Sequence, residues 1–453
     1  MAKINIKSKT INMTVGNPTG HLVRFALPML IGNIFQQVYN LVDSIIVGRY
    51  IGSSALAAVG ATGSVCFLFF ALCNGVGNGG GIVTSQYFGR GDEGNIRNCM
   101  TNTAYIMFGM SLVIGTIAFF LARPILNLLE TPASIMDNSL IYLQLQCIGL
   151  IFVALYNYAS SMLRALGDSK TPLYFLVFSC LVNTGLDLLF VRTFNLGVFG
   201  AALATVISQL ISGALCLIFA FRTNEYFTFT KENFRFRKDI FVQTVRIGVP
   251  LSMQFSLIAI SCMALQRVVN DFGPVAIAAF TATSRIEQLI HQPYQTLGSS
   301  LSTFSGQNYG ARKNDRVIKG LKISALIMTV FSLLMLPVMQ YLGKGIVSIF
   351  VEDAEVIEMG ARALLITSWF YIFLGMIYVV RGVLNGIGDA VFAIINGGCE
   401  ILCRLTLPIF FTMIPVMGLW GIWWSVGATW MLSGITAYLR YVWYKKSHLS
   451  VDK

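Results

Sequence analysis

The chain has 453 residues, of which 55% are hydrophobic and only 11% charged, and its mean hydropathy is +0.70. Soluble domains usually carry about 25% charged residues. This composition excludes a soluble globular protein and predicts an all-α integral membrane protein. The formal net charge of +12 would suit a nucleic-acid partner, so the positions of the basic residues matter.

Twelve apolar stretches are long enough to cross a bilayer, for which about 20 helical residues are needed. They run over residues 25–46, 55–78, 99–122, 138–163, 173–191, 198–221, 242–267, 275–300, 320–342, 358–385, 391–414 and 418–444. Too little chain remains between them for a soluble catalytic domain, so the sequence does not predict an enzyme. The first stretch is too long for a signal peptide, and we expect it to be retained.

The basic residues gather on one side of the predicted membrane. With a cytoplasmic N-terminus, 24 Lys and Arg fall in cytoplasmic segments and five fall outside, while Arg285, Arg362 and Arg404 are assigned to spans. Cytoplasmic loops of membrane proteins carry such an excess. We therefore expect both termini to be cytoplasmic, the chain to lie in the cytoplasmic (inner) membrane, and no nucleic-acid partner.

The first span carries a carboxylate, Asp43, in the apolar run NLVDSIIVG at residues 40–48. An ionisable group inside a span costs at least about 2.5 kcal/mol on insertion scales, so it usually has a partner or a function. Tyr39 lies one helical turn earlier on the same face. Pro28 lies early in the span, where a missing backbone hydrogen bond favours a hinge.

The end of the second span reads GVGNGG, at residues 75–80. This run matches the dinucleotide-binding pattern GxGxxG, but that mechanism requires a preceding strand and a helix N-terminus in water. Neither is predicted here. Close helix packing or a flexible bend is the better interpretation.

Spans 5 and 6 provide partners for Asp43. Asn183 and Asp187 share a face of span 5, and counting residues from the outer ends puts Asp43, Asp187 and Thr205 at nearly the same depth. Two carboxylates, an amide and a hydroxyl form a site for H+ or for a cation such as Na+. The alternative is a set of interhelical hydrogen bonds that only hold the bundle together.

Residues 221–240, FRTNEYFTFTKENFRFRKDI, form the longest cytoplasmic segment. Its alternating aromatic and basic residues suit the headgroup layer of a membrane. RNA binding is the weaker alternative, because the segment is short and tethered between spans.

Polar side chains return in spans 8 and 11. In TSRIEQLIHQPYQ, Glu287 and His291 share a stripe and form either a second proton site or an internally paired structural cluster. Glu400 and Arg404 are spaced for an ion pair within one helix. The side chains assigned to a candidate substrate cleft are Gln36, Gln254, Arg285, Glu287, Gln288 and His291.

The nine cysteines are scattered through the spans, without a CxxC motif or a Cys/His cluster of zinc spacing. We interpret them as buried small residues. The sequence predicts no cofactor other than a coupling ion.

The chain matches itself at an offset of 221 residues. QYFG at 86–89 falls on QNYG at 307–310, and Gly167-Asp168 falls on Gly388-Asp389. Each repeat holds six spans, so the halves are parallel repeats, as in transporters with a central cleft between two lobes. The predicted domains are an N-lobe (1–221), a linker (222–241) and a C-lobe (242–453).

The acidic pair exists in one repeat only. The position that corresponds to Asp43 is Leu265, when one inserted residue is allowed for, and those that correspond to Asn183 and Asp187 are Arg404 and Pro408. A single functional site would break the symmetry in this way, whereas packing alone would not require it.

Twelve spans in two repeats, the opening run FALPMLIGNIFQQVYNLVDSIIVGRYIG, and the Asn183/Asp187 pair together resemble the multidrug and toxic compound extrusion (MATE) transporters. The resemblance covers residues from about 20 to 445. Members of the NorM type have acids in spans 7 and 10, but here Gln254 occupies roughly the first position and residues 359–388 contain no Asp or Glu. The chain therefore looks more like the DinF and MepA side of the family.

The resemblance implies a monomeric, cation-coupled antiporter that expels amphiphilic, mainly cationic, organic compounds by alternating access. It assigns H+ or Na+ binding to Asp43, Asn183, Asp187 and Thr205, with Tyr39 beside them. Two alternatives stay open. One is a flippase for lipids or lipid-linked oligosaccharides, which the small number of arginines in the spans disfavours, and the other is a membrane channel or enzyme.

Overall fold

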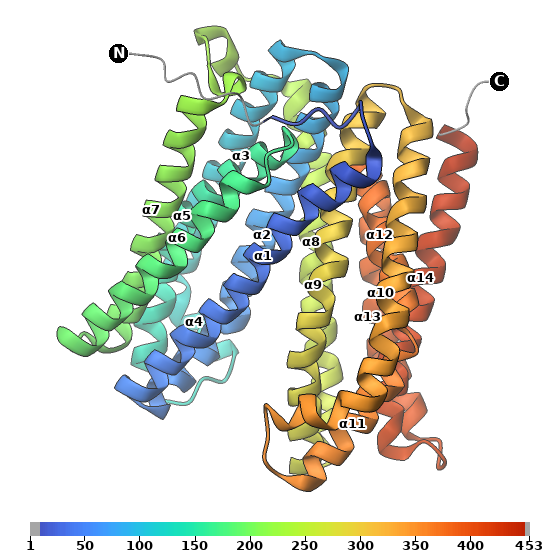
Figure 1. Cartoon of the computed structure of the whole chain (residues 1–453). Helices are drawn as coiled ribbons and strands as arrows, with labels where there is room; N and C mark the ends of the chain where they lie inside the picture. Colours follow the sequence, from blue (N-terminus) through green and yellow to red (C-terminus); the bar gives the residue numbers. More distant parts are fainter. Residues whose placement is uncertain (1–9, 449–453) are drawn as a thin grey trace. The chain divides into compact units, whose positions relative to one another are not determined.

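The computed structural model describes residues 10–448, and every regular element within them is a helix (Figure 1). Apolar runs without β alternation favour helices, because a helix satisfies its own backbone hydrogen bonds in lipid. The first half contains α1 (Pro18–Ile46), α2 (Ser53–Arg90), α3 (Glu93–Phe120), α4 (Ala122–Leu128), α5 (Met136–Ala165), α6 (Lys170–Asp187) and α7 (Gly197–Thr223). All of these except α4 correspond to predicted spans.

The second half contains α8 (Lys238–Asn270), α9 (Pro274–Gly310), α10 (Asn314–Ser348), α11 (Ala354–Ser368), α12 (Tyr371–Ile387), α13 (Ala390–Thr412) and α14 (Gly421–His448). The continuous span predicted for residues 358–385 is wrong in one respect, because α11 and α12 meet at a 54° bend. At the end of α11 the hydroxyls of Thr367 and Ser368 donate to carbonyls of their own helix, at 3.3 and 2.7 Å. Such bonds compete with the backbone ladder and bend helices.

Eight helices in the described part of the chain are long and apolar enough to cross a membrane, or nine if α11 and α12 form one span. The helices α1, α9 and α14 are equally long but more polar, and with them the segments number twelve. The predicted all-α fold with twelve membrane segments is confirmed.

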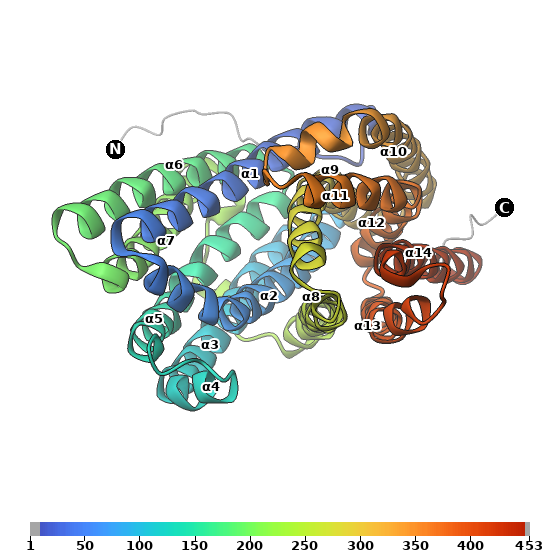
Figure 2. The same ribbon diagram turned by 90° about the horizontal axis from the view of Figure 1, so that it is seen from below.

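The predicted internal repeat is also visible in the helices. Adding 221 residues to Glu93, where α3 begins, gives Asn314, where α10 begins. The packing recurs as well: α2 packs on α5 as α9 packs on α12, and α5 packs on α7 as α12 packs on α14 (Figure 2). The second six helices therefore repeat the first six.

The described chain forms two compact units. Unit 1 comprises residues 10–12 and 27–252, and unit 2 comprises residues 13–26 and 253–448. The boundaries lie close to Pro28 in α1 and Pro250 in α8, both inside continuous helices. The start of α1 thus belongs to unit 2 and the start of α8 to unit 1.

Residues 13–26 are held in unit 2 by hydrogen bonds. The Met13 amide donates to Gln307 at 2.9 Å, and the Ser300 hydroxyl donates to the Leu22 carbonyl at 3.0 Å. Arg316 donates to the carbonyl of Met13 at 2.9 Å. Met13 and Leu22 are fully buried, so this segment is an integral part of the unit.

The glycines of GVGNGG let α2 and α8 cross closely inside unit 1. A Cβ atom on Gly75 would lie 2.4 Å from the backbone nitrogen of Ser252, and one on Gly79 would lie 2.5 Å from the Cα of Gly248. The Ser252 hydroxyl donates to the Leu72 carbonyl at 3.2 Å. Only glycine fits these positions, so the predicted close packing is confirmed.

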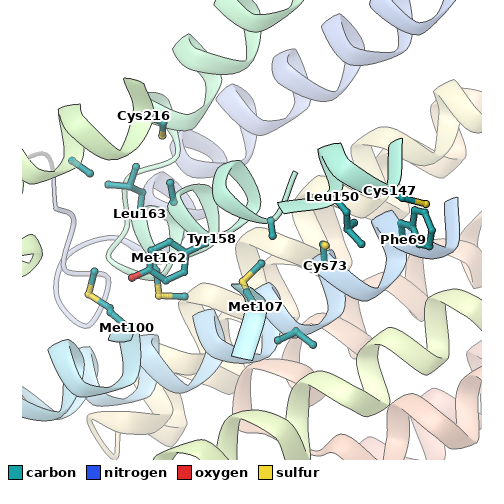
Figure 3. Packing of buried hydrophobic residues seen from close by; sticks show 14 of the residues in the cluster. Phe69, Cys73, Met100, Met107, Cys147, Leu150, Tyr158, Met162, Leu163 and Cys216 are labelled. Carbon is teal, nitrogen blue, oxygen red and sulfur yellow. The ribbon is translucent and has the colours of Figure 1, made fainter. Parts of the chain in front are cut away.

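A sulfur-rich apolar cluster fills the interior of unit 1 (Figure 3). Cys73 of α2, Met107 of α3, Cys147 of α5 and Cys216 of α7 all point into it. Six of the nine cysteines are buried, as predicted, whereas Cys66 and Cys399 are half-buried and Cys262 is exposed.

The segment between α7 and α8 folds against α3. It contains the short helices η3 (Glu225–Phe227) and η4 (Lys231–Phe234). Tyr105 donates to the Phe234 carbonyl at 2.8 Å, and the Arg237 amide donates to Asn102 at 3.1 Å. Phe234 and Phe236 remain exposed beside basic residues, an arrangement that agrees with the headgroup location predicted for this segment.

Candidate functional site

The two carboxyl groups predicted to meet are brought together in unit 1. Asp43 lies near the end of α1 and Asp187 is the last residue of α6, and their side chains are hydrogen-bonded to each other. Asp187 is fully buried and Asp43 half-buried. A hydrogen bond between two carboxyl groups requires a proton on one of them, so this arrangement is suited to holding one shared proton.

Asn183 and Thr205 hold Asp187 in place. The Asn183 amide nitrogen donates to Asp187 Oδ2 at 2.7 Å, and its carbonyl oxygen accepts from the Thr205 backbone N–H at 3.1 Å. The Thr205 hydroxyl donates to the Ala201 carbonyl at 3.1 Å and is also hydrogen-bonded to the Tyr39 hydroxyl. The five residues predicted for cation or proton coupling therefore form one cluster from α1, α6 and α7.

One oxygen of each acid receives no hydrogen bond from another kind of side chain or from the backbone. The Oδ1 atoms of Asp43 and Asp187 are buried, and no amide, hydroxyl or cationic group of the described residues donates to them. Unmet acceptors of this kind are costly inside a protein. Together with the Thr205 and Tyr39 hydroxyls they form an oxygen donor set, which suits a proton or a hard cation such as Na+.

The C-terminal ends of both acid-bearing helices have a feature that sequence reasoning missed. Directly after α1 and α6, the chain forms the π-helical turns η1 (Val47–Ile51) and η2 (Leu188–Thr193). These turns help to build an apolar cap, whose buried members are Ile46, Val47, Ala55, Val191, Val198 and Ala201. Isolated π-helical turns often occur at functional sites.

Tyr142 of α5 is a further neighbour that the sequence analysis did not include. It packs on the apolar cap and lies within electrostatic range of Asp43, Asp187 and Tyr39. Tyr142 lies about two turns from the start of α5. Counting residues from the end of this span, as was done for Asp43 and Asp187, would have placed Tyr142 at a similar depth.

The residues assigned to a substrate cleft are divided between the two units. Gln36 is half-buried on α1 in unit 1, while Arg285 and Gln288 are exposed on α9 in unit 2. Gln254 is buried and donates to the Asn396 side chain at 3.3 Å, so its amide is engaged within unit 2.

Glu287 and His291 lie one turn apart on α9. Oε1 of Glu287 and Nε2 of His291 are both buried, and neither has a hydrogen-bond partner among the described residues. The His291 ring contacts Tyr378 of α12 and Trp430 of α14, with centroids 6.2 and 5.5 Å away.

The ion pair predicted between Glu400 and Arg404 is present, at 4.0 Å. The nearer partner of Glu400, however, is Arg381 of α12, at 2.7 Å. Arg381 lies inside the predicted span 358–385 and was omitted from the arginines assigned to spans. Glu400 therefore joins two helices, which spacing within one helix cannot reveal.

Within residues 10–448 no group of three or more His, Cys, Asp or Glu side chains is placed to hold a metal ion. A cation at the acid pair would depend on amide and hydroxyl oxygens in addition to two carboxylates.

Comparisons with known proteins agree with this architecture. The MatE family model matches residues 28–189 and 250–409, which cover both repeats and well over half of the chain. The probable multidrug resistance protein YpnP of Bacillus subtilis is 28% identical over 96% of this chain and 97% of its own length. The multidrug export protein MepA of Staphylococcus saprophyticus is 24% identical over 95% of both chains.

Solved structures show the same fold. An outward-facing multidrug resistance MATE family transporter of the MOP superfamily has a TM-score of 0.90 at 22% identity, covering 98% of this chain and 100% of that one. A MOP superfamily transporter from Pyrococcus furiosus has a TM-score of 0.89 at 23% identity, with the same coverage. The family match, the twelve helical segments and the repeat lead to one conclusion: the chain belongs to the MatE family, the MATE transporters.

Proposed function

We propose that the protein is a multidrug efflux antiporter in which the entry of a cation drives the export of amphiphilic, mainly cationic, organic compounds. The observation that carries the proposal is the hydrogen-bonded Asp43–Asp187 pair, buried in unit 1 beside Asn183, Thr205 and Tyr39. The names of the relatives, multidrug resistance protein and multidrug export protein, support export of drugs.

The chemistry of the pair explains how a cation would act. Two unit charges about 4 Å apart repel by roughly 4 kcal/mol at an effective dielectric constant of about 20. One proton or one Na+ removes this repulsion. The two carboxylates repel each other when the site is empty and not when a cation is bound. The empty and the occupied site therefore favour different conformations, and this difference is what couples cation binding to transport.

In the proposed cycle, cation binding draws Asp43 of α1 toward Asp187 of α6, α1 rearranges about Pro28, and the substrate is released outside. The cation then leaves to the cytoplasm and the gradient restarts the cycle. The functional unit is a monomer in the cytoplasmic membrane, with both termini in the cytoplasm.

The test is transport by Asp43→Asn in inverted membrane vesicles, using a fluorescent lipophilic cation and an imposed gradient of either H+ or Na+. We expect gradient-driven accumulation of the dye by the unaltered protein and its loss to background in the variant. The amide of asparagine carries no negative charge and does not take up a proton, so the cation that moves down its gradient is no longer bound at this position. The gradient that drives the unaltered protein identifies the coupling ion.

Glu93→Gln is the matched control, because Glu93 is an exposed acid of unit 1 paired with Arg97 at 3.3 Å. It should transport normally. Full dye accumulation by Asp43→Asn, at equal amounts of folded protein, would contradict the proposal. Absence of dye transport by the unaltered protein, together with movement of a labelled lipid, would support the flippase alternative instead.

A further inference from the structure

Unit 2 buries its own set of charged side chains. Arg381 pairs with Glu400 at 2.7 Å, and Arg404 lies 4.0 Å from the other oxygen of Glu400. Arg404 also donates to the Ser261 hydroxyl at 3.0 Å and contacts the Cys262 sulfur at 2.8 Å. Two guanidinium groups thus share one carboxylate, and this network needs a second negative charge to be neutral.

Glu287 is the carboxyl group that can supply this charge. It lies on α9, within electrostatic range of Arg404 of α13, and the Thr367 hydroxyl of α11 hydrogen-bonds to it. The hydroxyl of Tyr371, near the start of α12, lies beside both Thr367 and Glu287. Four helices of unit 2 therefore meet at this carboxyl group.

As a carboxylate, Glu287 can only accept hydrogen bonds, and its buried Oε1 receives none from the described residues. As a carboxylic acid, it becomes a donor. An acceptor stands one helical turn away, because Nε2 of His291 is also buried and unpartnered. Arg404, which lies within electrostatic range, favours the ionised form, whereas burial of Oε1 without a hydrogen-bond partner among the described residues favours the neutral form.

We propose that Glu287 is a second proton-binding group, separate from the acid pair of unit 1. Taking up a proton changes the buried group of Arg381, Glu400, Arg404 and Glu287 from neutral to a net charge of +1. Arg404 disfavours Na+ as the occupant, because its guanidinium, within electrostatic range of Glu287, would repel a second cation. The proposal does not depend on the transport reaction.

Infrared difference spectroscopy of the purified full-length protein tests it directly, since a protonated carboxyl group has a C=O stretching band that disappears on ionisation. The Asp43→Asn/Asp187→Asn double variant removes the signal of unit 1. We expect a band that still titrates in this double variant and is lost when Glu287→Gln is added. Glu358→Gln, which removes an exposed acid of unit 2 paired with Lys344, should leave the band unchanged.

Isotope labelling provides a test without any substitution. In the unaltered protein labelled with 13C-glutamate, part of the titrating band should shift in frequency, because the Glu287 carbonyl is labelled and the aspartates are not. A titrating signal in the double variant that does not change when Glu287→Gln is added would overturn the proposal, because the other carboxyl groups, which titrate as well, would then account for it. Failure of Asp43→Asn to affect transport would contradict the proposed antiport but leave the spectroscopic result untouched.

Discussion

At the scale of single residues, the acid pair shows how far sequence reasoning reaches in a membrane protein. Asp43, Asn183, Asp187, Thr205 and Tyr39 were predicted to meet because charges are rare in spans and each span has a fixed rise per residue. The structure places all five in one cluster. Their part in cation coupling stays a prediction.

The contact that depth counting could not have found is the one between Arg381 and Glu400. The link between Arg381 and Glu400 joins two helices, at 2.7 Å, and depends on the rotation of each helix about its axis. Depth follows from counting residues, but rotation is set by packing against neighbours. Exposure was unpredictable for the same reason: Arg285 and Gln288 are exposed on α9, and their place in a substrate cleft stays a prediction.

Asn183 offers a measurable prediction at this scale. Asn183→Ala removes the donor 2.7 Å from Asp187 Oδ2, and we expect about 1–3 kcal/mol of destabilisation, because a buried carboxylate loses a hydrogen bond. Equilibrium unfolding in detergent would measure it. In an Asp187→Ala background the same change should cost much less, since the acceptor is absent.

A cost that is equal in both backgrounds would show that Asn183 acts on something other than Asp187. Ser179→Ala is a suitable comparison, because Ser179 lies one turn earlier on α6 and donates to the Ser208 carbonyl at 3.2 Å. The loss of stability caused by Ser179→Ala should be the same with Asp187 present and in the Asp187→Ala background.

At the scale of the elements, apolar length predicted where helices lie but not where they change geometry. The bend between α11 and α12 and the π-helical turns η1 and η2 contain no proline to reveal them. They arise from local hydrogen bonding and packing, which hydropathy does not register. The glycines of α2 were easier to interpret. Four glycines within six residues of a span favour close packing of two helices, because small residues let the backbones approach each other.

The crossing of α2 and α8 yields a second prediction. Gly79→Ala places a Cβ atom 2.5 Å from the Gly248 Cα, so the helices must separate and we expect a loss of about 1–3 kcal/mol or more. Thermal unfolding of the purified protein would measure it.

Gly63→Ala provides the control on the same helix, because a Cβ atom there meets nothing within 4 Å. It should be neutral or slightly stabilising, since alanine is the better helix former. Similar losses for the two variants would mean that helix propensity, and not the crossing, accounts for the effect.

At the scale of the whole molecule, the repeat was visible in the sequence, whereas the membership of the two units was not. Matching residues at a constant offset reveal a duplication, but contacts decide that residues 13–26 belong to unit 2 and the start of α8 to unit 1. Neither six-helix half of the sequence therefore contains a complete unit.

This organisation predicts how the chain behaves when it is cut between η3 and η4. Residues 1–229 or 230–453 expressed alone should be degraded, because each half lacks a buried segment. Expressed together they should restore drug resistance, as measured by the growth of cells at inhibitory drug concentrations. Removing residues 1–26 from the first fragment should abolish this rescue, and stable accumulation of either fragment by itself would contradict the prediction.

The buried start of α1 also imposes an order of events during synthesis. Met13 and Leu22 have their partners on α9, at Gln307 and Ser300, nearly 300 residues later in the chain. At about 5–20 residues per second, the ribosome needs roughly 15 to 60 s to make the intervening chain. The N-terminal segment has no packing partner during that time. It can dock into unit 2 only after α9 has been synthesised.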